Sequence, residues 1–209
     1  MMKRLALAIT AAAAFSSPTL AADLSFVGNF SDGNDVQLFN FVVGAPSTVT
    51  LRSWSYAGGV NAQGATIDRG GFDPILALFD GNGFQIGQND DDQTGTVAPD
   101  AVTGEQFDVF LQRVLDPGNY TVSIQAYSNF AIGPNLSDGF EGDGSLTDVT
   151  GDVRNNKWAF DILGVESATQ VGSVPEASTW AMMIMGIGFV GYAMRRRNPA
   201  EGRKPALTV

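Results

Sequence analysis

Residues 48–56 read T-V-T-L-R-S-W-S-Y and residues 120–127 read Y-T-V-S-I-Q-A-Y, and both stretches alternate in polarity. Such alternation is typical of a β-strand that buries one face, and it places Val49 and Leu51 on the same face. The second stretch follows the sequence D-P-G at residues 116–118, which favours a reversal of the chain. These two stretches predict antiparallel β-structure.

Short apolar runs of strand length occupy much of the remaining chain up to residue 174. The sequence D-G-N-G at residues 80–83, a strong hairpin signal, joins two of them. Between residues 23 and 174 no convincing apolar repeat of about 3.6 residues indicates a helix. The pattern predicts one all-β domain, an antiparallel β-sandwich or jelly roll, and about 150 residues are enough to bury a core. The runs are residues 24–30, 36–43, 75–79, 84–86, 109–115 and 158–163.

The N-terminus has the three parts of a secretory signal peptide. Lys3 and Arg4 are followed by an apolar stretch at residues 5–15 and by the small-residue sequence T-L-A at residues 19–21. This order is typical of a cleavable export signal. We therefore expect a signal peptide at residues 1–21 and a mature protein that begins near Ala22.

The C-terminal stretch at residues 174–197 reads V-P-E-A-S-T-W-A-M-M-I-M-G-I-G-F-V-G-Y-A-M-R-R-R. Its apolar part, residues 180–194, carries no charge, and with residues 177–179 it approaches the roughly 17 to 25 residues of a membrane span. The three arginines mark the cytoplasmic end. The sequence thus predicts a transmembrane helix within residues 174–197 and a cytoplasmic tail at residues 198–209. The span would anchor the protein before processing.

This order of a Pro-Glu motif, an apolar run and an arginine cluster resembles the PEP-CTERM sorting signal of exported proteins of Gram-negative bacteria. The resemblance implies recognition by an exosortase, a transpeptidase-like enzyme of the inner membrane, and then a cell-surface or extracellular location. Ala177 departs from the usual motif, which has a proline at that position. The residues that carry the resemblance are Pro175, Glu176, Trp180, Arg195, Arg196 and Arg197.

The composition of the part between the two terminal signals restricts its function. This part contains 20 acidic and 5 basic residues, a net charge of about −15, which disfavours binding to nucleic acid. The chain has no histidine and no cysteine, so catalytic triads with histidine and His-ligated zinc are excluded. We expect no enzymatic activity. The alternative is a secreted carboxylate-dependent hydrolase of the glycosidase type, for which no recognisable catalytic spacing is present.

Residues 72–92 (F-D-P-I-L-A-L-F-D-G-N-G-F-Q-I-G-Q-N-D-D-D) and 115–124 (L-D-P-G-N-Y-T-V-S-I) resemble the bacterial pre-peptidase C-terminal (PPC) domain. The resemblance implies a small, non-catalytic β-sandwich that assists binding or localisation. We expect this sandwich at residues 22–163 and a linker at residues 164–173. Analogy with exported proteins that carry the sorting signal suggests exopolysaccharide or biofilm matrix as a partner.

An acidic run, Asn89 followed by three aspartates, comes shortly after the predicted hairpin. Calcium binds carboxylate, amide and carbonyl oxygens, and these acids approach the start of the hairpin if its strands pair. The sequence therefore suggests a calcium site. The alternative is a solvated loop in which the aspartates cap turns. The candidate ligands are Asp73, Asp80, Asn82, Asp90 and Asp92.

Overall fold

The computed structural model describes residues 21–92 and 94–172. They form an all-β unit with antiparallel sheets, as predicted, and no α-helix occurs among them. Residues 1–20 of the predicted signal peptide and the predicted transmembrane helix lie outside these ranges. In the part of the chain that is described, no helix is long and apolar enough to cross a membrane.

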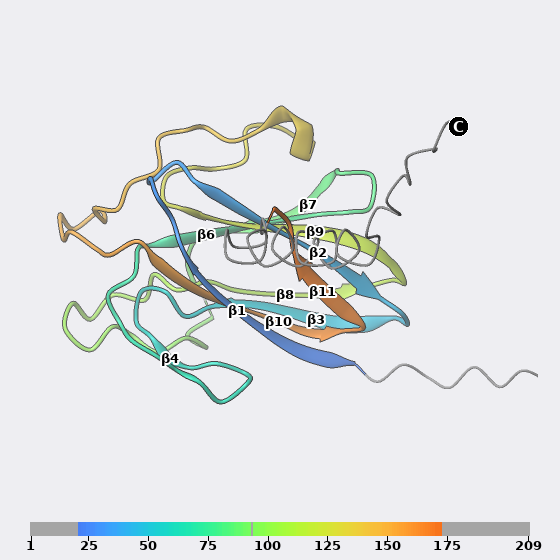
Figure 1. The fold of residues 1–209 in the computed structure, drawn as a ribbon, viewed down its shortest axis with the longest axis horizontal. Coiled ribbons are helices and arrows are strands. Elements are labelled where there is room, and N and C mark those ends of the chain that lie inside the picture. The colour runs from blue at the N-terminus through green and yellow to red at the C-terminus, as the bar shows by residue number, and fades with distance from the viewer. Residues whose placement is uncertain (1–20, 93, 173–209) are drawn as a thin grey trace, which may run out of the picture. The chain divides into compact units, whose positions relative to one another are not determined.

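Two sheets stack on each other (Figure 1). The first has the strand order β1 (Ala22–Asn29), β10 (Lys157–Val165), β3 (Ser47–Ser53) and β8 (Phe110–Leu115). The second has the order β11 (Ser167–Gln170), β2 (Val36–Val43), β9 (Gly118–Ala126), β6 (Pro74–Phe79) and β7 (Gln85–Asn89). A separate small hairpin consists of β4 (Gly59–Val60) and β5 (Thr66–Ile67), and a short 3₁₀ turn forms at Leu136–Asp138.

The core lies between the two sheets and follows from the alternation of the strands. Val49 and Leu51 of β3 are buried, whereas the intervening threonine and the following arginine are half-exposed. Phe39 of β2 meets Phe160 and Trp158 of β10, with ring centroids 5.2 and 5.7 Å apart. Aromatic pairs at such distances stabilise a core beyond the area they bury. The predicted strand at residues 48–56 is confirmed for its first six residues.

Strand β6 is buried on both faces, which explains its uninterrupted apolar sequence. All six of its residues are buried. Leu76 and Leu78 contact the core, and the segment at residues 127–146 is joined to the neighbouring strand β7, where Pro134 O accepts a hydrogen bond from Gln85 N (2.6 Å). Ala131 N also donates to Oε1 of Gln88 (3.2 Å).

The predicted linker at residues 164–173 instead belongs largely to the sandwich. Strand β10 continues to Val165, and β11 pairs with β2 in an antiparallel register. Val171 N then donates to Leu38 O (2.8 Å), and Gln37 Nε2 donates to Val171 O (2.7 Å). The short sequence S-A-T-Q of β11 has no apolar alternation and so did not predict a strand. Backbone hydrogen bonds to β2 are enough to hold it at the edge of the sheet. The folded part therefore ends about eight residues later than predicted.

Candidate functional site

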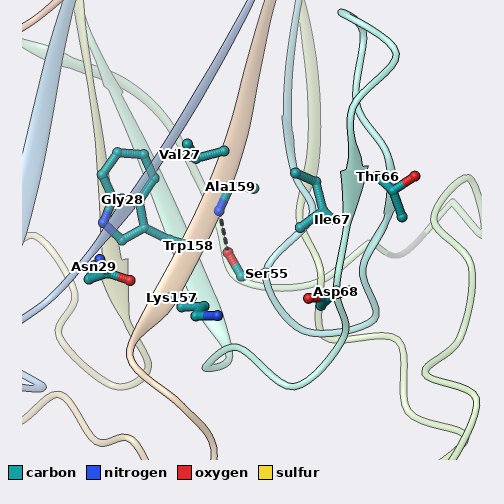
Figure 2. A pocket seen from close by; sticks show the side chains of 10 residues that line it. All are labelled: Val27, Gly28, Asn29, Ser55, Thr66, Ile67, Asp68, Lys157, Trp158 and Ala159. Carbon is teal, nitrogen blue, oxygen red and sulfur yellow. Dashed lines mark hydrogen bonds between the residues drawn. The ribbon is translucent and has the colours of Figure 1, made fainter.

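An open pocket of about 350 Å³ lies between the β1–β10 edge of the first sheet and the small β4–β5 hairpin. Figure 2 shows Thr66, Ile67 and Asp68 on one side, Val27 and Lys157 on the other, and Ser55 between them. Ser55 Oγ accepts a hydrogen bond from Ala159 N (3.3 Å). The pocket is thus built from three segments far apart in the sequence. Its lining is Val27, Gly28, Asn29, Ser55, Thr66, Ile67, Asp68, Lys157, Trp158 and Ala159.

The lining combines apolar contact surface with a few polar groups. Val27 and Ile67 offer aliphatic side chains, Asn29 and Thr66 offer hydrogen-bonding groups, and the pocket carries one carboxylate, that of Asp68. Such a mixture is typical of sites that bind small polar molecules. Catalysis by paired carboxylates needs a second acid, and none lines this pocket.

Asp161 holds the β4–β5 hairpin over the first sheet. This residue of β10 is 1% exposed, and its carboxylate accepts hydrogen bonds from Ser25 Oγ (2.5 Å), Trp54 Nε1 (2.7 Å) and Ala62 N (2.9 Å). A Cβ added at Gly59 would lie 2.7 Å from the Trp54 ring, so the hairpin backbone packs directly on that ring. Trp54 is consequently a support of the pocket wall.

A second polar cluster lies under the loops that follow β3 and precede β8. Arg69 binds Asp100 through two hydrogen bonds, both 2.6 Å long, and Arg154 Nη2 lies 3.7 Å from the same carboxylate. Burial alone would raise the pKa of Asp100, but hydrogen bonds from Arg69 and from the backbone of Thr103 and Val102 hold it well below its usual range. This geometry indicates a structural role, because the carboxylate is fully occupied by donors.

The five predicted calcium ligands do not lie together. Asp73 precedes β6, and Asp90 and Asp92 follow β7, so these three lie at one end of the hairpin. Asp80 and Asn82 lie in the turn at its other end, separated by a six-residue strand of about 20 Å. Within the described ranges no group of three or more acidic, histidine or cysteine side chains is arranged to hold a metal ion. A single ion cannot contact all five.

Two of these aspartates cap turns, as the alternative interpretation expects. Asp80 Oδ1 accepts hydrogen bonds from Asn82 N and Phe84 N, both 2.9 Å long, and Gly83 adopts a φ of +83° in the same turn. Asp92 accepts hydrogen bonds from Thr94 N (2.8 Å) and Val97 N (2.6 Å). The predicted hairpin at residues 80–83 is confirmed by this geometry.

Asp73 differs from the capping aspartates, because it is 4% exposed and its Oδ1 has no hydrogen-bond partner among the described residues. Burial, and then the charges of Asp91 and Asp90, raise the pKa of Asp73 to about 8. Burial, followed by Asp90 and Glu105, raises the pKa of Asp91 to about 6. The sequence interpretation chose alternate members of the acidic run and so omitted Asp91. The buried Gln125 was missed too, since in sequence it is one polar residue of an alternating strand.

The comparisons with known proteins concern the C-terminal stretch. Residues 173–197 match the PEP-CTERM protein-sorting motif. A comparison with curated proteins finds no match. The match includes Pro175, Glu176, Trp180 and the three arginines, and it confirms the predicted sorting signal. The chain accordingly carries the signal of an exported protein that an exosortase-type enzyme processes from a membrane-anchored precursor in Gram-negative bacteria.

Proposed function

We propose that this chain is a non-catalytic surface or extracellular-matrix protein whose β-sandwich binds exopolysaccharide after exosortase processing. The observation that carries the proposal is the order of its parts. The last strand, β11, ends at Gln170, and the sorting motif begins at residue 173. Cleavage at the motif would release a sandwich whose strands and core are already in place. The proposal includes a sandwich of the PPC type, which is non-catalytic. It also includes processing of the sorting signal although Ala177 replaces the usual proline of the motif.

The pocket beside the β4–β5 hairpin supports a neutral or zwitterionic sugar as the ligand. We expect Asn29 and Thr66 to hydrogen-bond the hydroxyl groups of a pyranose, and Val27 and Ile67 to pack on its apolar C–H face. The net charge of about −15 on residues 22–174 repels strongly anionic polymers. An uncharged or mixed-charge polysaccharide is therefore the expected partner. Hydrolysis of the same polysaccharide by paired carboxylates would need a second acid beside Asp68 in the pocket.

Affinity electrophoresis of the mature protein through gels that contain the host's own exopolysaccharide tests the proposal. Val27→Arg fills the pocket mouth with a long charged side chain, and we expect it to weaken retardation about tenfold, equivalent to about 1.4 kcal/mol. Val114→Arg is the matched control, because Val114 is also exposed on an edge strand and lies outside the pocket. Equal retardation of the two variants would refute this binding site. Release of reducing ends from the polysaccharide by the wild type would favour the alternative, a carboxylate-dependent hydrolase.

A further inference from the structure

The pocket beside the β4–β5 hairpin carries two opposite charges. Lys157 begins β10 on one wall, and Asp68 follows β5 on the opposite wall (Figure 2). The ion pairs found in residues 21–92 and 94–172 join Arg69 and Arg154 to Asp100. Within these ranges, therefore, Lys157 and Asp68 form an ion pair neither with each other nor with a third residue. The pocket presents an ammonium group and a carboxylate that a ligand can contact separately.

The backbone on both walls is held in place by close packing. A Cβ added at Gly58 would lie 2.9 Å from the main-chain carbonyl carbon of Asp68. Three residues further on, Gly71 N donates to Ser55 O (2.8 Å). A Cβ added at Gly71 would lie 2.5 Å from Lys157 O, so the segment after Asp68 packs directly on the start of β10. The separation of the two charged residues is thus set before a ligand arrives, and only their side chains have to be ordered on binding.

Neither of these two charges has a partner that would explain it by stability. Both residues are exposed, and exposed charges contribute little to the stability of a fold. By contrast, the guanidinium of Arg52 lies 3.7 Å from the centre of the Trp54 ring. Lys157 is the one lysine between the two terminal signals, in a part of the chain with a net charge of about −15. Complementary charges across an interface mainly provide specificity, so this pair points to a ligand that carries both signs of charge.

We infer that the pocket selects a zwitterionic polysaccharide, in which a free amino group and a carboxylate lie on one sugar or on adjacent sugars. The inference rests on the proposed function and narrows its ligand class. Lys157 binds the carboxylate and Asp68 binds the ammonium group, each through charge-assisted hydrogen bonds. A neutral chain would take water from both charges without replacing it. A chain that carries only carboxylates would be repelled by Asp68 and by the acidic surface around the pocket.

The test is surface plasmon resonance of the full chain, purified in a non-ionic detergent, over the host's own exopolysaccharide. The polysaccharide is immobilised in three forms: untreated, with its amino groups acetylated, and with its carboxylates amidated. Sodium chloride at 0.2 M screens non-specific attraction, because the Debye length is then below about 10 Å. The variants are Lys157→Gln and Asp68→Asn. Their matched controls, Arg113→Gln and Asp116→Asn, remove the same charges at exposed positions outside the pocket.

We expect Lys157→Gln and Asp68→Asn each to weaken binding to the untreated polysaccharide about threefold to tenfold, whereas both controls bind as the wild type does. On the amidated polysaccharide the difference between Lys157→Gln and the wild type should vanish. On the acetylated polysaccharide the difference between Asp68→Asn and the wild type should vanish. This crossed pattern assigns each charge to its own partner group, and a general loss of structure would not produce it.

Two results would overturn the inference. One is wild-type affinity of Lys157→Gln and Asp68→Asn for the untreated polysaccharide, and the other is a loss that persists unchanged on both modified polysaccharides. If Val27→Arg still abolishes binding in either case, the pocket remains the binding site and only the zwitterionic ligand class is wrong. If Val27→Arg also binds as the wild type does, the proposed binding site itself is wrong.

Discussion

The guanidinium of Arg154 lies over the ring of Tyr56, with its central carbon 3.6 Å from the ring centroid. Its Nη2 also donates to Tyr56 O (2.8 Å), and its Nε donates to Gly71 O (3.0 Å). Tyr56 in turn donates its hydroxyl to Asp148 (2.7 Å). One arginine thus joins the end of the β3 strand to the start of the chain leading into β6. The planar fork of arginine suits this position better than the point charge of lysine.

Arg154→Lys should therefore destabilise the folded protein although it preserves the charge. It removes the stacked plane and at least one of two hydrogen bonds at a residue that is 8% exposed. We expect a loss of about 2 kcal/mol in the free energy of unfolding, measured by urea denaturation of the mature protein. Arg113→Lys on the exposed side of β8 is the control and should change the stability by less than about 0.5 kcal/mol. Equal stability of the two variants would contradict the role given to Arg154.

Asp100 should make the fold sensitive to acid. Its pKa in the folded protein lies below the value of about 3.9 expected for an unfolded chain, since Arg69 and backbone donors outweigh the effect of burial. A lowered folded pKa contributes stability that is present above the unfolded pKa and is lost as the pH falls toward the folded value. The difference in unfolding free energy between the wild type and Asp100→Asn should consequently be largest near pH 7 and shrink below about pH 4. Urea denaturation of both proteins at a series of pH values measures this difference in unfolding free energy. A difference that does not change with pH would show that ionisation of Asp100 does not contribute to stability.

Gly28 is required because Trp158 occupies the space of a side chain. A Cβ built at Gly28 would lie 2.3 Å from Cζ2 of the indole, which is held in the core against Phe30 and Phe39. We expect Gly28→Ala to cost about 1–3 kcal/mol through forced repacking. The control is Gly87→Ala, where the nearest atom to the new Cβ is 3.6 Å away. Thermal or urea unfolding compares the two variants, and a neutral Gly28→Ala would show that the indole can move aside freely.

The sorting signal gives a prediction that can be read in cells. Pro175 and Glu176 belong to the matched sorting motif and precede the apolar run in sequence. We expect the Glu176→Ala variant to remain an unprocessed inner-membrane form. Cell fractionation locates the protein, and mass spectrometry of both of its ends shows whether it has been cleaved. Glu166→Ala, an exposed acid beside β11, should mature normally. Normal maturation and surface delivery of Glu176→Ala would exclude the recognition of this glutamate by the processing enzyme.

Local patterns predicted the strands and their buried faces, because a period of two along the chain decides which side chains share a face. For this reason the alternation around Val49 and Leu51 and the turn at residues 80–83 predicted the elements that the structure contains. Which strands pair depends on contacts between distant residues. Ser25 and Asp161, joined by a hydrogen bond, are 136 positions apart, and the polar strand β11 forms only because β2 offers it backbone partners.

The charged and polar sites depended on the tertiary structure even more strongly. The acidic run looked uniform in sequence, yet Asp92 caps a turn and Asp91 is half-buried, while Asp73, at the same end of the hairpin, is buried. Asp73 and Gln125 are buried in the folded protein, where the segment at residues 127–146, distant in sequence, is hydrogen-bonded to β7 and to the main chain of Asp73. Composition predicted an acidic protein, and the terminal motifs predicted export and a C-terminal sorting signal. Only folding decides which carboxylates lose their water, since desolvation is a property of the neighbours that surround a residue in three dimensions.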